Sequence, residues 1–217
     1  MSKATLILGE SGSGKTASLR NMNPSKTLLI QVQSKPLPFR TKEWALFDKE
    51  NNVTGNIIVS DDSDTIISIM YKTKRPIIVI DDFQYMLANE YMRRSGERGF
   101  DKFTEIGRHA WDVMEASSKL NEHVRVYIFA HTDTDDFGRV RMKTIGKLLN
   151  EKVTPEGKFT SVLRTAVRDG KYYFQTHNSG NDTIKTPMEM FEADFIDNDL
   201  AMFDRTLCDY YDIQQEQ

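Results

Sequence analysis

The feature that most constrains this chain is an eight-residue, glycine-rich segment close to its N-terminus. Residues 9–16 read GESGSGKT and match the pattern G-x-x-x-x-G-K-[ST], and an apolar run at 5–8 comes immediately before them. This order indicates a buried strand, a tight phosphate-binding loop (P-loop) and a helix over residues 15–22. Glycines allow polyphosphate to approach backbone N–H groups without an intervening Cβ atom. The sequence therefore predicts a polyphosphate site here.

The residues of this loop have distinct predicted roles. We expect the Lys15 ammonium to reach the β and γ phosphates of a nucleotide and the Thr16 hydroxyl to ligate Mg²⁺. The N-terminal dipole of the following helix favours the same anion. The expected nucleotide contacts cover the loop and the residue after it: Gly9, Glu10, Ser11, Gly12, Ser13, Gly14, Lys15, Thr16 and Ala17. A chance glycine-rich turn fits less well, because Lys-Thr and the apolar run both stand at the required spacing.

A second acidic motif follows the apolar run at residues 77–80, where four consecutive β-branched residues predict a strand buried on both faces. Asp81 ends this strand, where ligands bind in open α/β sheets, so we expect it to hold Mg²⁺ directly or through water. Asp82 is a candidate general base or water-orienting residue. Glutamate is commoner in that role, so the shorter side chain leaves the assignment open beside a simple solvated carboxylate.

A polar residue also ends the apolar strand expected at 124–130. His131 follows that strand and is the candidate sensor of the γ phosphate, completing a predicted catalytic set with Lys15 and Asp82. The alternative is a histidine that only caps the strand end.

Alternation of apolar runs with helical patterns predicts the fold class. Strands are expected at 27–32, 56–59, 77–80 and 124–130, and helices start near 61–64 and cover most of 84–121. This order favours an α/β fold with a doubly wound, mainly parallel sheet and helices on both faces. Asp169-Gly170 is a favoured two-residue turn, so strands 159–167 and 171–176 are expected to form an antiparallel hairpin at the sheet edge. A last helix is expected over 198–211, and the segment around Trp44 and Phe47 is a loop or short hairpin.

Composition bounds the remaining choices. The chain has 217 residues, of which 39% are hydrophobic and 28% charged, which fits a single domain over 1–217. We divide it into a nucleotide-binding core (1–131), a charged hairpin with edge strands (132–187) and a C-terminal helix with a tail (188–217). A net charge of -3 gives no general attraction to nucleic acid. The single cysteine, Cys208, excludes an internal disulfide, and we expect it to be a small apolar residue of the last helix. No apolar run approaches membrane-spanning length and no signal peptide is evident, so a soluble cytoplasmic protein is expected.

Charge changes sign after His131. An acidic turn at 133–136 leads into Phe137 and a basic stretch that predicts an exposed hairpin able to reach DNA or a neighbouring subunit, with a solvated charged loop as the alternative. A later basic residue could also contact the γ phosphate, within the chain or across an interface. The sequence does not choose among the four candidates, Lys147, Lys152, Arg164 and Lys185.

With these motifs the chain resembles the RecA-like P-loop ATPases of bacteriophages and prophages, described as AAA-family phage nucleotide-binding proteins. The resemblance rests on residues 9–16, 80–85, 130–132, 143–147 and 185–188. It implies a RecA-like core that binds ATP and Mg²⁺ and hydrolyses ATP. By kinship with phage single-strand annealing and recombination ATPases, it also implies a role in phage DNA recombination or replication. Its expected partners are single-stranded DNA, a phage replication or recombination protein and further copies of itself, in the cytoplasm of a bacterial host.

Two functions follow as hypotheses. In the first, the chain is a Mg²⁺-dependent ATPase that assembles on single-stranded DNA through basic and aromatic side chains, namely Arg139, Arg141, Lys143, Phe137, Tyr172 and Tyr173. In the second, it is a nucleotide-dependent binding module that recruits a protein partner while hydrolysis is slow. A small-molecule phosphotransferase is less favoured because no arginine-rich lid segment is evident.

Overall fold

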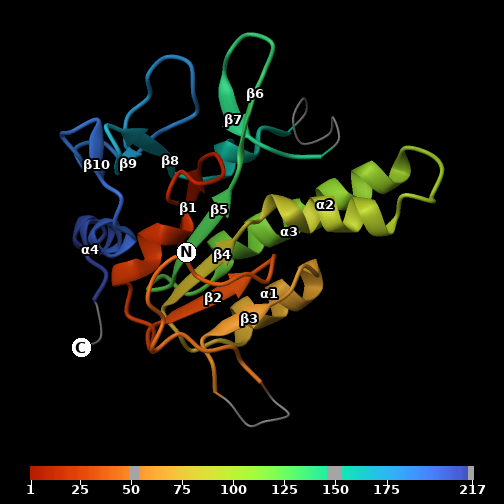
Figure 1. Ribbon diagram of the computed structural model, residues 1–217, viewed down its shortest axis with the longest axis horizontal. Helices are drawn as coiled ribbons and strands as arrows, with labels where there is room; N and C mark the ends of the chain where they lie inside the picture. Colours follow the sequence, from red (N-terminus) through yellow and green to blue (C-terminus); the bar gives the residue numbers. More distant parts are fainter. Residues whose placement is uncertain (49–53, 146–152, 215–217) are drawn as a thin grey trace.

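The computed structural model describes residues 1–48, 54–145 and 153–214 and shows an α/β fold built on one mostly parallel sheet (Figure 1). The strand order is β10-β9-β8-β1-β5-β4-β2-β3. Its strands are β1 (Lys3–Leu8), β2 (Thr27–Gln31), β3 (Ile57–Val59), β4 (Ile77–Asp81), β5 (Arg125–Ala130), β8 (Ser161–Arg168), β9 (Lys171–Gln175) and β10 (Phe195–Asp197). The helices are η1 (Thr16–Asn21), α1 (Ser63–Lys72), α2 (Gln84–Arg93), α3 (Asp101–Lys119), η3 (Pro155–Lys158) and α4 (Leu200–Tyr210). This architecture is consistent with a P-loop NTPase fold.

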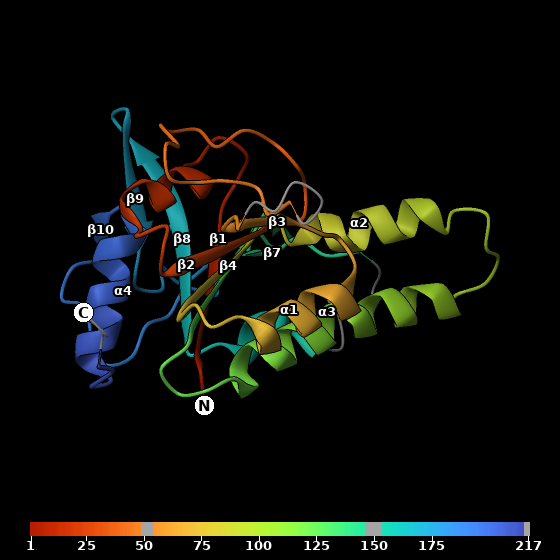
Figure 2. The same cartoon turned by 90° about the horizontal axis from the view of Figure 1, so that it is seen from below.

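Both faces of the sheet are covered, which explains why its central strands are apolar along their whole length. Alternate residues of β1 belong to different cores: Leu6 and Leu8 pack with α1, α2 and α3, whereas Ile7 packs with η1 and α4. Figure 2 shows α1, α2 and α3 gathered on one side of the sheet and α4 on the other. Helices therefore lie on both faces, as the sequence predicts.

The register of the parallel strands brings the four chain segments that follow β1, β5, β4 and β2 together at the carboxyl end of the sheet. Leu8 of β1 is level with Ala130 of β5, and Asp81 of β4 is level with Gln31 of β2. The carboxyl ends of these strands thus emerge together, so the P-loop, residue 131, residue 82 and the segment after β2 are neighbours in space. Ligands bind at the carboxyl ends of the strands in open α/β sheets.

Several predicted elements differ in detail. The helix predicted at 15–22 is a six-residue 3₁₀ helix, η1, followed by an extended Met22. Asn23-Pro24 follows directly, and the residue before a proline avoids helical geometry, so the helix ends before this pair, as the sequence predicts. Within its described residues, the segment around Trp44, expected as a loop or short hairpin, makes a parallel bridge from Leu46 to Ile57 of β3.

The C-terminal third extends the sheet beyond β1. Strand β8 pairs in parallel with β1, and Asp169 and Gly170 adopt positive φ angles of 51° and 73° in the tight turn to antiparallel β9. The hairpin is not the outermost element, because β10 pairs antiparallel with β9 outside it. Separately, β6 (Thr132–Thr134) and β7 (Val140–Met142) form a two-stranded sheet, and Cys208 is buried in α4.

Candidate nucleotide-binding site

The P-loop follows β1 and packs against the Thr165 side chain of β8. Gly14 has a φ of 98°, a left-handed conformation that favours glycine. A Cβ atom on Gly9 would lie 1.8 Å from the Thr165 Oγ1 atom of β8, so a larger residue there would force the Thr165 side chain to shift. The Ser13 and Thr165 hydroxyls are 2.6 Å apart and tie the loop to β8. The glycine pattern therefore reflects contacts with this strand as well as access for phosphate.

Lys15 is buried and lies folded against its own loop. Its Nζ atom donates to the Gly9 carbonyl at 2.9 Å and to the Glu10 carbonyl at 2.8 Å. Burial lowers the pKa of Lys15 to about 8, and the carboxylates of Asp82 and Asp81 oppose part of that change. The ammonium is thus held at the loop as a compact cation that an anionic ligand can attract.

Thr16 and Asp81 meet at the point where a divalent cation was predicted. The Thr16 hydroxyl donates to Asp81 Oδ2 at 2.9 Å, although 65 positions separate them in sequence. Asp81 is buried, and its Oδ1 atom has no hydrogen-bond partner among the described residues. Burial, aided by the charge of Asp82, raises the pKa of Asp81 to about 6. A cation would relieve this buried carboxylate.

The donor set fits Mg²⁺ in particular. Among the described residues no group of three or more His, Cys, Asp or Glu side chains could hold a metal on its own. Mg²⁺ is usually bound by one or two protein oxygens, with waters and substrate phosphates completing its octahedron. One hydroxyl and one carboxylate beside a P-loop match that requirement.

Asp82 turns away from Asp81 because its backbone is left-handed, with a φ of 62°. Its carboxylate forms an ion pair with Lys35 and lies 3.6 Å from the His131 Nε2 atom. Burial alone would raise the pKa of Asp82, but His131 and Lys35 lower it below the ordinary value. The same pair raises the pKa of Lys35 against the effect of its partial burial. Asp82 is therefore ionised at neutral pH and held between two basic groups.

A cavity of about 290 Å³ opens beside this cluster. It brings together three predicted site residues, Ser11, Asp82 and His131, with four that were not predicted as site residues: Gln33, Lys35, Tyr85 and Asn89. The backbone N–H of His131 donates to Gln84 Oε1 at 3.1 Å, and its ring meets Tyr85 edge to face. The candidate sensor and the candidate base thus share one wall of a cavity next to the P-loop.

Lys35 is the main residue that sequence reasoning missed. It lies four residues after β2, and β2 pairs with β4, which carries Asp81. Polar residues that follow any parallel strand reach the same sheet edge, so inspecting the segment after each predicted strand would have found it. No local motif marks this lysine.

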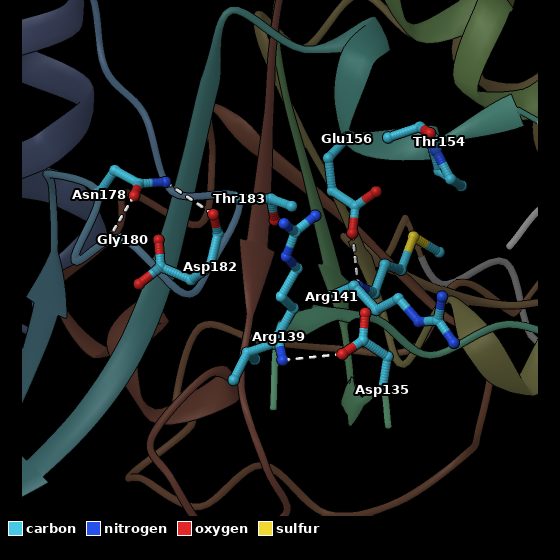
Figure 3. Close-up of a pocket in the computed structure, with 12 residues that line it drawn as sticks. Asp135, Arg139, Arg141, Thr154, Glu156, Asn178, Gly180, Asp182 and Thr183 are labelled. Atoms are coloured by element: carbon cyan, nitrogen blue, oxygen red, sulfur yellow. Dashed lines mark hydrogen bonds between the residues drawn. The ribbon is translucent and has the colours of Figure 1, made fainter. Parts of the chain in front are cut away.

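The β6–β7 hairpin, which carries the basic residues Arg139 and Arg141, contributes no residue to the lining of this cavity. Phe137, between β6 and β7, is 88% exposed. Figure 3 shows a second cavity, of about 390 Å³, where Arg139 and Arg141 lie among the acidic side chains of Asp135, Glu156 and Asp182. The surface is therefore mixed in charge.

The remaining predicted contacts are spread over the fold. Tyr172 shares a strand face with Phe174, which packs in the α4 core, and its ring lies against Gly14 of the P-loop. Arg164 of β8 is level with Leu8 of β1, and Lys185 forms an isolated antiparallel β-bridge with Val162. Lys147 and Lys152 lie outside the described residues.

Within the described part of the chain, no helix has the length and apolar character needed to cross a membrane. No protein-family model matches the chain. No curated protein matches it either. Among solved structures, the genome packaging NTPase B204 from Sulfolobus turreted icosahedral virus 2, in complex with ATP-gammaS, is similar. That similarity covers 77% of this chain and 76% of that chain, with a TM-score of 0.39 and 11% identity, which is too weak to assign a family or a function.

Proposed function

We propose that this chain is a Mg²⁺-dependent ATPase of the P-loop class. One observation carries the proposal: the Thr16 hydroxyl lies 2.9 Å from the buried Asp81 carboxylate at the mouth of the P-loop. Two distant segments thereby place a hydroxyl and a carboxylate where P-loop enzymes require a metal beside the β and γ phosphates. A chance glycine-rich turn gives no reason for this buried pairing.

The other side chains have roles that follow from their positions. Lys15 would exchange the carbonyls of Gly9 and Glu10 for phosphate oxygens, because an anion attracts the buried ammonium more strongly. Bound Mg²⁺ would offset charge on the phosphates. Asp82 and His131 face the cavity beside the loop and would orient the attacking water. Lys35, in the same cavity, would contact the γ phosphate.

Phosphate release tests this proposal. Wild type should release phosphate from ATP only with Mg²⁺, and Lys15→Ala and Asp81→Asn should each lower the rate by at least a hundredfold, roughly the effect of losing one transition-state charge contact. Thermal unfolding without nucleotide checks that both variants are folded. Equal rates for wild type and Lys15→Ala would overturn the assignment.

We extend the proposal to single-stranded DNA, bound by the β6–β7 hairpin in phage recombination or replication. Its support is the resemblance described above and the exposure of Phe137 and Arg139 on this hairpin. Exposed aromatic rings stack on bases of any sequence, and basic residues contact the backbone. Single-stranded DNA should then accelerate hydrolysis, with binding that weakens as salt rises. No acceleration and no salt-sensitive binding would contradict it.

A nucleotide-dependent binding module is the second candidate, and the state of Asp82 favours it. A carboxylate whose pKa lies below its ordinary value, between Lys35 and His131, is a weak proton acceptor at neutral pH. Hydrolysis would then be slow while bound ATP still orders the site. In this case Asp82→Ala should leave partner binding intact and Lys15→Ala should abolish it. Loss of binding in both variants would exclude this candidate.

A further inference from the structure

Beside the P-loop lies a buried side-chain amide whose polar atoms have no hydrogen-bond partner in the described part of the chain. Asn198 is 2% exposed and stands between β10 and α4. Its backbone is fixed, because its N–H donates to the Tyr172 carbonyl at 3.2 Å and its carbonyl accepts from Arg20. Its side-chain Oδ1 and Nδ2 atoms are both buried, with no hydrogen-bond partner among the described residues. Leaving both atoms unpaired costs stability, so a function is the natural explanation.

The amide and an aromatic ring meet the P-loop at the same point. A Cβ atom built on Gly14 would lie 3.2 Å from Asn198 Oδ1 and 2.8 Å from Tyr172 Cδ1. Tyr172 is half exposed, so part of its surface faces solvent beside Gly14. For a ligand bound to the loop to reach the buried amide, the Tyr172 ring would have to turn towards that solvent.

Strand order indicates which end of a nucleotide lies here. Strands β5 and β4, which lead to His131, Asp81 and Asp82, lie on one side of β1, and β8 and β9 lie on the other. If the γ phosphate faces Asp82, as the proposed function requires, the rest of the nucleotide extends past Gly14 towards β9. The nucleoside then arrives at Tyr172 and Asn198.

We propose that Tyr172 and Asn198 form the nucleobase site and select adenine; this inference rests on the proposed ATPase function. The Tyr172 ring stacks on the base, a contact that any base can make. The Asn198 amide donates to a ring nitrogen and accepts from the exocyclic amino group, the paired donor and acceptor that adenine presents to asparagine. The corresponding edge of guanine offers two acceptors and leaves the amide oxygen unpaired.

Calorimetric titration with three Mg²⁺ complexes tests this site: ATP, GTP and inorganic tripolyphosphate. Wild type should bind ATP more tightly than GTP or tripolyphosphate. Asn198→Leu should weaken ATP binding by roughly tenfold to a hundredfold and remove the preference over GTP. Tyr172→Ala should weaken both nucleotides, and Tyr172→Phe should restore them. Neither Asn198→Leu nor Tyr172→Ala should alter tripolyphosphate binding, and Tyr71→Ala, an exposed tyrosine of α1, should alter nothing.

Asn198→Leu also separates recognition from folding. Because the side-chain amide has no partner among the residues that the structure describes, an apolar side chain of similar size should leave the unfolding temperature unchanged or raise it, whereas a structural asparagine would lower it. If this variant weakens tripolyphosphate as much as ATP, or leaves the preference for ATP intact, the base site is wrong while the P-loop assignment stands. Failure of wild type to bind tripolyphosphate would instead overturn the proposed function and this inference with it.

Discussion

Two adjacent aspartates have opposite electrostatic environments, and this separates their chemistry. Asp81 points into the interior, and burial raises its pKa to about 6. Asp82 has a left-handed backbone and faces Lys35 and His131, which lower its pKa although burial opposes them. Neighbouring groups with divergent pKa values divide roles in this way at functional sites. Asp81 is suited to a cation, and Asp82 to a fixed negative charge.

The first prediction concerns the stability cost of Asp81. In metal-free buffer at pH 7.5, Asp81→Asn should be more stable than wild type, because the amide keeps the acceptor for Thr16 without a buried charge. A carboxyl whose pKa rises from 3.8 to about 6 on folding binds its proton more tightly when folded, so stability falls as pH rises from 3.8 through about 6 and the full cost is present above that range. The cost is at most about 3 kcal/mol, or several degrees in unfolding temperature.

Thermal unfolding at two pH values checks the sign. At pH 4.5 Asp81 is protonated in the folded protein, so most of the difference between wild type and Asp81→Asn should vanish. A difference of the same size at pH 4.5 and pH 7.5 would show that ionisation of Asp81 is not its origin.

The second prediction concerns Lys35, which faces the cavity beside the P-loop. Lys35→Met should lower kcat for ATP by tenfold or more, because it removes a positive charge from where charge develops on the γ phosphate. KM should change less, since Lys15 and the loop still hold the nucleotide. Lys42→Met is the matched control, an exposed lysine after the same strand. Equal kcat for the two variants would remove Lys35 from the catalytic set.

At the scale of elements, the β6–β7 hairpin is the predicted DNA contact, and two phenylalanines provide a matched pair. Phe137 is 88% exposed on this hairpin, and Phe100, between α2 and α3, is 86% exposed. Phe137→Ala should weaken single-stranded DNA binding by about 1–3 kcal/mol, the value of one stacked base, and Phe100→Ala should not. Fluorescence anisotropy with a labelled oligonucleotide measures both. Equal effects of the two substitutions would exclude the hairpin as the specific contact.

Elements with local signals were predictable from sequence, and contacts set by strand order were not. The β-branched run before Asp81 identifies a buried strand, and the loop around Gly14 is recognisable because its chemistry is contiguous. Lys35 and Asn198 reach the site only because β2 lies beside β4 and β10 lies beside β9. Periodicity shows that a segment is a strand but not which strand lies next to it. The helix expected after the loop is present, but as a six-residue 3₁₀ helix over Thr16–Asn21, a geometry that the sequence pattern did not specify.

At the scale of the whole molecule, the site is open to contributions from another chain. The described residues that line the cavity beside Asp82 include one lysine and no arginine. P-loop enzymes often receive an arginine from a neighbouring subunit to stabilise transition-state charge. The predicted homo-oligomer would supply it.

The last prediction is therefore that hydrolysis per chain rises with protein concentration. Lys15→Ala, inactive in its own site, keeps its surface and should still donate a basic residue, so adding it to dilute wild type should raise the wild-type rate. Serum albumin at equal mass controls for losses to surfaces. Light scattering with a non-hydrolysable ATP analogue should show assembly over the same concentration range. A rate per chain that stays constant with dilution, and no gain from added Lys15→Ala, would mean that one chain holds the complete site.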